Sequence, residues 1–248
     1  MARAGIASRR ECEKMIEAGQ VQVNGRVAKL GDKADPAVDK IVVRGTLLKP
    51  RAQKLIYVAL NKPKGVLSST EDELGAGRKT VRDLVPLPDR LYPVGRLDKQ
   101  SEGLILMTND GDLAHKLTHP RYGHKKTYRV TLEGRLDPES LKKWRKGVYL
   151  DGRKTAPAQI TILQQEQNFT LLEIVMREGR KRQIRRIASM LGYPVKQLVR
   201  EKIGPISLGR LRSGDWRYLT ASEVKILREA VSQSGKRKGK KRRKNKKR

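Results

Sequence analysis

The sequence predicts an α+β protein with a small N-terminal module, a larger second domain and a disordered basic tail. Segments typical of strands are interspersed irregularly with segments typical of helices, which argues against a doubly wound sheet. The 248 residues suffice for one large domain together with a small one. The last 14 residues, 235–248, contain 11 Lys or Arg and no apolar side chain, so they cannot bury a core.

Residues 1–48 are typical of a compact module. Ser8 and Glu11 form a capping box, in which the serine hydroxyl and the glutamate carboxylate satisfy free amides at a helix start. Cys12, Met15 and Ile16 recur at helical spacing, and Gly19 is placed to end the helix. Strands are expected at 21–23 and 41–43, with a hairpin turn at Asn24-Gly25.

A polar linker is expected at 49–53, followed by the larger domain at 54–234. Strands are predicted at 55–60, 104–107, 126–132 and 170–176, and a loop at 71–79. Helices are predicted at 112–118, 138–146, 181–191 and 221–231, the last with Thr220 as its N-cap.

The charge points to a polyanionic partner. The net charge is +31, and +20 remains when the 11 charges of the tail are taken away. Each phosphate that such a protein neutralises releases counterions, so RNA is a natural partner. The tail is expected to be either an RNA-binding appendage or a solubilising segment without specific contacts. Self-repulsion at this charge favours a monomer.

Several classes of protein are excluded. The apolar runs, such as 104–107, are only a few residues long, against about 20 needed to span a membrane. No secretory or transit signal opens the chain, so a cytoplasmic location is expected. The single Cys12 allows no internal disulfide and no cysteine-rich zinc site. His115, His119 and His124 lie close together in sequence, but no HExxH pattern supports a metal site there.

The tetrapeptide Gly-Arg-Leu-Asp occurs twice, at 95–98 and 134–137. Asp137 precedes Pro138 at the start of a predicted helix, and N-capping explains its carboxylate fully. Asp98 instead lies in a loop that enters a buried strand, with no helix to cap. Taken alone, such an aspartate is usually a turn residue or an ion-pair partner.

The surrounding sequence resembles the RsuA-type pseudouridine synthases. The matching segments are "NKPKGVLSS", "YPVGRLDKQSEGLILMTNDGDLAHKLTHP", "KKTYRV", "REGRKRQIRRIASMLG" and "IGPISLGRLRSGDWRYLT". The N-terminal "ARAGIASRRECEKMIEAGQVQVNGRVAKLGDKAD" resembles an S4 RNA-binding domain. Such domains usually have one or two helical turns before this segment, so the first helix is truncated or the start codon misassigned. Together the resemblances cover nearly all of residues 1–231.

The resemblance implies a fold and an activity. It implies an S4-like domain followed by a catalytic domain with a mixed, largely antiparallel sheet, which isomerises a specific uridine in ribosomal RNA. The closing segment favours 23S rRNA or a large-subunit assembly intermediate as the partner. A 16S rRNA synthase and a non-catalytic assembly factor are the alternatives. The reaction replaces a C–N glycosidic bond by a C–C bond without redox change, so no metal and no cofactor are expected.

Three site residues follow from the resemblance. It implies that Asp98 is the catalytic aspartate, that Tyr128 stacks on the target base and that Arg185 pairs with Asp98. The carboxylate could act as a nucleophile or as a base, and the target base must leave its stack to reach it. Tyr128 shares an alternating strand face with Val130 and Leu132, so a core position is its alternative. Arg185 falls at the edge of the apolar stripe of its helix, where it can turn inward.

Other basic residues are expected to contact RNA. Arg96, two residues from Asp98, could bind a flanking phosphate or brace the loop. Lys62 and Lys64 in the first motif steady the cleft or bind backbone. Arg182 and Arg186 are placed to meet phosphates, and a solvated basic face is their alternative. The full set of expected RNA contacts is Arg3, Arg9, Arg10, Lys62, Lys64, Lys126, Arg182 and Arg186.

Overall fold

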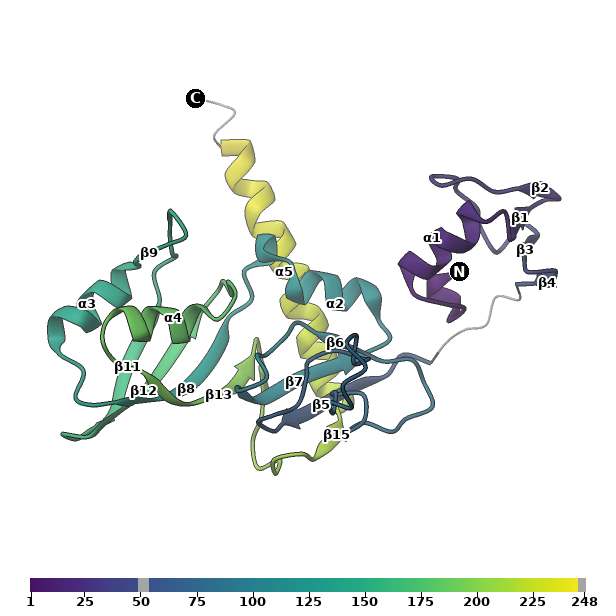
Figure 1. The fold of residues 1–248 in the computed structure, drawn as a ribbon. Helices are drawn as coiled ribbons and strands as arrows, with labels where there is room; N and C mark the ends of the chain where they lie inside the picture. The colour runs from purple at the N-terminus through teal and green to yellow at the C-terminus, as the bar shows by residue number, and fades with distance from the viewer. Residues whose placement is uncertain (49–53, 245–248) are drawn as a thin grey trace. The chain divides into compact units, whose positions relative to one another are not determined.

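The computed structural model describes residues 1–48 and 54–244, without the side chains of Arg3 and 233–244 (Figure 1). The chain divides into two compact units, residues 1–55 and 56–248. The linker predicted at 49–53 lies outside the described residues. None of the described helices is long and apolar enough to cross a membrane.

The first unit packs one helix against a four-stranded sheet. The Ser8 hydroxyl accepts a 3.1 Å hydrogen bond from the Glu11 amide, so the predicted cap begins helix α1. Met15 of α1 packs against Val21 and Val43 in a small core. The elements of this unit are η1 (Ala2–Ala4), α1 (Arg9–Glu17), β1 (Val21–Val23), β2 (Arg26–Val27), β3 (Ile41–Val43) and β4 (Thr46–Leu47), with strand order β2-β1-β3-β4.

The second unit is built on a nine-stranded sheet. Seven of its strands follow the order β11-β12-β8-β13-β7-β5-β15, and the other two, β14 and β6, pair with β13 and β7. Within this sheet β13 and β7 are paired in parallel and the other neighbours are antiparallel, which confirms a mixed, largely antiparallel sheet. The strands are β5 (Tyr57–Lys62), β6 (Tyr92–Val94), β7 (Glu102–Thr108), β8 (Lys126–Glu133), β11 (Gln159–Gln165), β12 (Phe169–Met176), β13 (Val195–Ile203), β14 (Ile206–Ser207) and β15 (Trp216–Tyr218). The remaining elements are α2 (Gly111–Thr118), η2 (Pro120–Tyr122), α3 (Pro138–Lys146), the hairpin β9 (Tyr149–Leu150) and β10 (Arg153–Lys154), α4 (Gln183–Met190) and α5 (Ala221–Lys244).

Both faces of the sheet are covered. On one face, the helices α3 and α4, the long connection 66–91 and Leu97 pack on the strands in the larger core. On the other face, α2 and α5 pack on β5 and β7. Alternate residues of β7 divide between the two cores, with Ile105 and Met107 in one and Leu104 and Leu106 in the other. This explains why 104–107 is a continuous apolar run.

The structure differs from the sequence prediction at α5 and at β13. Helix α5 begins after Thr220, whose hydroxyl accepts from the Glu223 amide at 3.2 Å, but it continues to Lys244 rather than ending at 231. The helix thus reaches into the basic tail 235–248, of which 245–248 lie outside the described residues. Strand β13 was not predicted, because charged and polar side chains interrupt its apolar pattern.

Candidate active site

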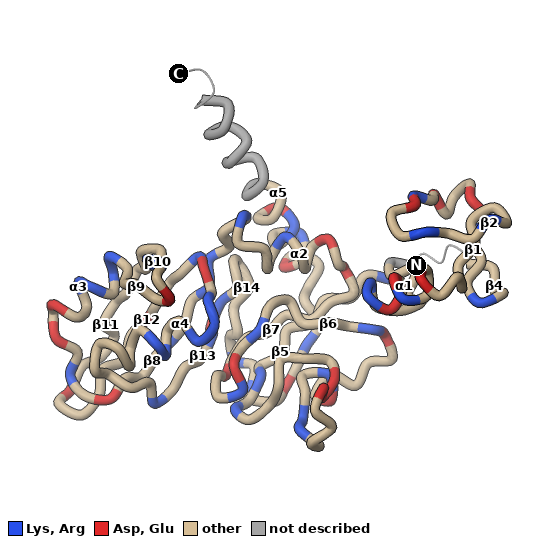
Figure 2. Tube along the Cα trace, turned by 45° about the horizontal axis from the view of Figure 1, so that its top comes forward, with Lys and Arg blue, Asp and Glu red and all other residues tan. Residues whose placement is uncertain are grey.

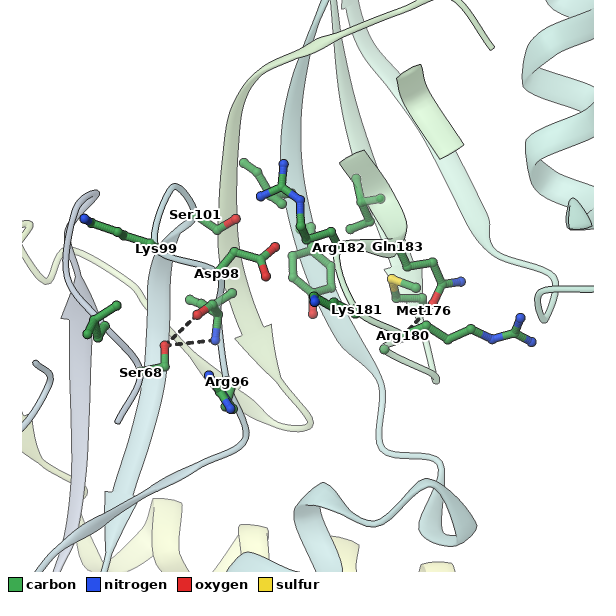
Figure 3. Close-up of a pocket in the computed structure, with 16 residues that line it drawn as sticks. Ser68, Arg96, Asp98, Lys99, Ser101, Met176, Arg180, Lys181, Arg182 and Gln183 are labelled. Carbon is green, nitrogen blue, oxygen red and sulfur yellow. Dashed lines mark hydrogen bonds between the residues drawn. The ribbon is translucent and has the colours of Figure 1, made fainter. Parts of the chain in front are cut away.

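A cavity of about 650 Å³ opens on the face of the sheet that carries α3 and α4 (Figure 3). One wall is the loop that leads into β7, and the opposite wall is the segment that leads into α4. The floor comes from the sheet. The lining residues are Leu67, Ser68, 96–99, Ser101, Tyr128, Met176, 179–184 and Leu198.

Asp98 lies in the first of these walls and is half-buried. The backbone before it is fixed by buried Ser68, whose hydroxyl donates to the Leu97 carbonyl at 2.7 Å and accepts from the Leu97 amide at 3.0 Å (Figure 3). The backbone after it is closed by a 2.9 Å hydrogen bond from the Ser101 amide to the Asp98 carbonyl. Among the described residues, none donates to the Asp98 carboxylate. A carboxylate on a fixed backbone segment, with its oxygens unoccupied and facing a cavity, is suited to react with a ligand.

Lys62 lies beneath this loop, and it does not make the RNA contact expected from the sequence. Its side chain is fully buried at the end of β5, and its ammonium donates to the carbonyls of Pro63 and Val66, both at 2.8 Å. Burial lowers the pKa of Lys62 to about 8, against the opposing effects of Glu102 and Asp98. An ammonium without access to solvent cannot bind an RNA phosphate. Lys62 instead binds the turn that follows β5 and, at 3.5 Å, the carbonyl of Lys99 next to Asp98.

Arg200 of β13 is a second buried cation under the same loop. Only 1% of its surface is exposed, and its guanidinium donates to the carbonyls of Leu104 at 2.7 Å and Arg96 at 3.2 Å. These two carbonyls bracket the Asp98 loop. The strand that carries Arg200 approaches β7 closely at Gly103, where a Cβ would lie 2.4 Å from the Arg200 carbonyl oxygen. The glycine therefore permits the parallel β7–β13 pairing that brings Arg200 under the loop.

Arg185 does not form the expected ion pair with Asp98 in this structure. Its Nη2 donates to the Gln100 carbonyl at 2.7 Å and its Nη1 to the Val195 carbonyl at 3.2 Å. Burial lowers the pKa of Arg185, while the charge of Asp98 raises it, so the two groups interact electrostatically without touching. The guanidinium does turn inward from α4, but it fixes the loop through the backbone of Gln100.

Tyr128 contributes to both the core and the cavity. It is 7% exposed on β8 and belongs to the larger core, yet it also lines the cavity. Met176, Ile184 and Leu198 complete an apolar surface beside it. A flat aromatic ligand could be desolvated against this surface while its polar edge faced Asp98.

Cationic side chains surround the mouth of the cavity. Arg96, Lys181 and Arg182 are exposed and line it, and Figure 3 shows Arg96 directed away from Asp98. Arg182 is the residue just before α4. Its φ of 52° lies in the left-handed region, which costs a non-glycine residue energy. A strained backbone at the edge of a cavity is typical of functional sites.

The remaining expected RNA contacts differ in their surroundings. Arg186 forms a two-point ion pair with Asp151, at 2.9 and 2.6 Å, which competes with the expected contact to an RNA phosphate. Burial and the charge of Arg200 lower the pKa of Lys126. Lys64 is exposed, as are Arg9 and Arg10 in the first unit, and Figure 2 shows how widely lysine and arginine are spread over both units. The side chain of Arg3 lies outside the described part of the chain.

Sequence reasoning missed Ser68, Ser101, Gly103 and Arg200. Ser101 is 1% exposed, lines the cavity and has no hydrogen-bond partner for its hydroxyl among the described residues. The GLILM run after Ser101 could have indicated a close backbone approach at Gly103, because glycine inside a strand often marks one. Nothing in the sequence marks Arg200 as buried.

Known proteins resemble this chain over most of its length. A family model described as RNA pseudouridylate synthase matches residues 56–190, and an S4 domain model matches residues 1–37. An uncharacterized RNA pseudouridine synthase of Aquifex aeolicus is 43% identical, covering 93% of this chain and 92% of the relative. Ribosomal large subunit pseudouridine synthase B of Bacillus subtilis is 42% identical over 95% of this chain and 96% of the relative.

Two further relatives agree with these. The dual-specificity RNA pseudouridine synthase RluF of Escherichia coli is 39% identical over 93% of this chain and 77% of the relative. A crystal structure of a pseudouridylate synthase superimposes with a TM-score of 0.66 at 32% identity, covering 91% of this chain and 96% of the other. The cavity around Asp98 thus belongs to a known enzyme fold, and the chain is a member of the RNA pseudouridylate synthase family with an N-terminal S4 domain.

Proposed function

We propose that this enzyme isomerises one specific uridine of 23S rRNA to pseudouridine, with Asp98 as the catalytic residue. The observation that supports this most strongly is the Asp98 carboxylate itself, unoccupied by any described donor and facing a cavity with an apolar floor and a cationic rim. A uracil ring fits the apolar floor, and the rim matches the phosphates on either side of it.

The chemistry needs few groups. The bond from ribose C1′ to uracil N1 breaks, the uracil turns, and C1′ joins C5, which then gives up its hydrogen as a proton while N1 takes one up. One carboxylate suffices, as a nucleophile or as the base that removes a ribose proton. The target nucleotide must leave its stack to enter the cavity. Tyr128 is proposed to stack on the uracil, and Arg185 to fix the Asp98 loop through Gln100.

The choice of rRNA rests on the relatives. The Bacillus subtilis protein bears the name of a large-subunit synthase, and it matches 95% of this chain, including the S4 domain. The same chemistry on small-subunit RNA would leave every residue of the cavity in the same role. The S4 domain and the basic tail are proposed to provide orientation and sequence-independent affinity.

The test is to incubate unmodified 23S and 16S rRNA, free and in assembly particles, with the full-length enzyme. Pseudouridines are mapped by carbodiimide labelling and reverse transcription. A single new stop in 23S rRNA is the expected result. A stop in 16S rRNA alone would overturn the substrate assignment, and no stop in either RNA would overturn the proposed function.

A further inference from the structure

An exposed stack of rings lies at the corner between α2 and β8, outside the cavity. Tyr122 of η2 is its centre. The Arg121 guanidinium lies over the Tyr122 ring, 4.7 Å from its centroid. The imidazole of His124 stacks with Tyr122, at 6.4 Å between centroids and 24° between planes.

Two more imidazoles contact the stack by their edges. His115 and His119 meet Tyr122 at centroid distances of 6.3 and 6.2 Å and at steep angles of 84° and 78°. The Nδ1 atom of His119 also accepts a 3.1 Å hydrogen bond from the Arg121 amide, which fixes the backbone that carries the guanidinium. The described histidines form no group that could hold a metal ion.

One end of the stack is buried and the other is open to solvent. His124 is 7% exposed, whereas Arg121, His115 and His119 are exposed. Tyr122 is half-buried and the Arg121 guanidinium over it is exposed, so this contact does not pack the core. The outer plane of that guanidinium is available to a flat ligand.

The residues that flank the stack contact two segments that lead into the cavity walls. A Cβ on Gly95, the residue before Arg96, would lie 3.7 Å from Cγ2 of Thr118 at the end of α2. Asp98 is three positions after Gly95, which limits the distance between their Cα atoms to about 11 Å. On the other side, a Cβ on Gly123 would lie 4.0 Å from the side chain of Arg177, just after β12.

The charge of this corner fits single-stranded RNA. Lys116, Arg121, Lys125 and Arg177 are all exposed around the rings. Stacking on aromatic rings and arginine planes, combined with phosphate contacts, is how proteins bind unstacked nucleotides. A nucleotide next to the flipped uridine has lost a stacking partner, and a guanidinium at this corner could replace it.

We propose that Arg121, whose guanidinium lies over the Tyr122 ring, is a stacking site for a base of the substrate RNA that neighbours the target uridine. This rests on the proposed function, because it needs an RNA strand that enters the cavity at Asp98. It assigns the α2–η2 corner a role in RNA recognition, separate from the chemistry in the cavity.

The test uses the rRNA fragment whose pseudouridine the wild-type enzyme has produced and mapped. Arg121→Ala is expected to weaken binding of this fragment about tenfold, within the range that stacking of one base contributes. Arg135→Ala, the loss of an equal charge from an exposed arginine on the turn before α3, is the control, with an expected change below twofold. Arg121→Lys keeps the charge but loses the plane, so it should resemble Arg121→Ala.

A second measurement locates the contact. The same fragment is made with 5-iodouridine beside the target position and irradiated with the full-length enzyme. Cross-links to residues 119–122 are expected. Equal affinities of the Arg121→Ala and Arg135→Ala variants, or wild-type affinity of Arg121→Lys, would overturn the proposal. Failure of the wild-type enzyme to modify any uridine would instead overturn the proposed function, so the two failures are distinguishable.

Discussion

Gly103 permits the close approach of β7 and β13. Its replacement by alanine should disturb the support of the Asp98 loop. The φ of Gly103 is +103°, and an added Cβ would lie 2.4 Å from the carbonyl oxygen and 2.6 Å from the nitrogen of Arg200. Both are backbone atoms of β13 and cannot rotate away. The two strands must separate, and Arg200 must move from the carbonyls of Arg96 and Leu104 that it binds.

The size of the effect follows from two contributions. The left-handed backbone costs a residue with a Cβ roughly 1–2 kcal/mol, and overpacking costs roughly 1–3 kcal/mol more. We expect Gly103→Ala to lower the free energy of unfolding by about 4 kcal/mol, which lowers Tm by roughly 8–16 °C in a domain of this size. Pseudouridine formation should fall as well, because the Asp98 loop loses its support.

The matched control is Gly134→Ala. Gly134 has a φ of +74°, but an added Cβ would meet nothing within 4 Å, so only the backbone contribution of about 1–2 kcal/mol is expected. Urea unfolding followed by tryptophan fluorescence measures both variants, since Trp144 and Trp216 both lie in the second unit. Equal unfolding free energies for the two variants would refute the reasoning about the β7–β13 contact.

Three further outcomes are expected. Burial lowers the pKa of Lys62 from 10.5 to about 8. Between pH 8 and 10.5 the unfolded chain therefore binds more protons at Lys62 than the folded chain does. Lys62 thus makes the free energy of unfolding rise with pH, by at most about 1.4 kcal/mol per pH unit. In Lys62→Met this part of the slope should disappear from urea unfolding between pH 8 and 10.5, and an unchanged slope would contradict the burial of its ammonium. Deleting 235–248 should weaken RNA binding and flatten its salt dependence while single-turnover chemistry stays nearly intact; an unchanged salt slope would mean that these residues do not touch RNA. Arg182→Ala should reduce the salt slope of RNA binding by about one, whereas Arg186→Ala should change it little because Asp151 already neutralises that charge; equal effects would contradict this assignment.

Local chemistry made much of the fold predictable. The Ser8 cap of α1 and the Asp137 cap of α3 are set by residues three positions apart, and both helices begin where the sequence indicates. The Asn24-Gly25 turn joins β1 to β2 in the same way, with both residues at positive φ. Strand β13 was not predicted because its buried positions include Arg200, and a charged side chain argues against burial in any pattern based on hydrophobicity.

The candidate site was predictable in composition but not in contacts. Motifs identified Asp98, Tyr128 and Arg185, and the fold brings Asp98 and Tyr128 to one cavity, with Arg185 bound to the backbone of the same loop. The burial of Lys62 could not be deduced, since its partners are the carbonyls of neighbouring residues. Nor could the pairing of Arg186 with Asp151, which are 35 positions apart and meet only because the β9–β10 hairpin lies against α4.

The central claim is that the Asp98 carboxylate performs the isomerisation, and the second Gly-Arg-Leu-Asp copy provides its control. In Asp98→Asn the acidic oxygen is lost with little change in shape. In Asp137→Asn the α3 cap is kept, because asparagine is also a good N-cap. The most direct measurement is single-turnover release of tritium from rRNA labelled at uridine C5. We expect Asp98→Asn to bind RNA normally but to release tritium at least about a hundredfold more slowly, with Asp137→Asn near wild type. Tritium release by Asp98→Asn at the wild-type rate would contradict the account.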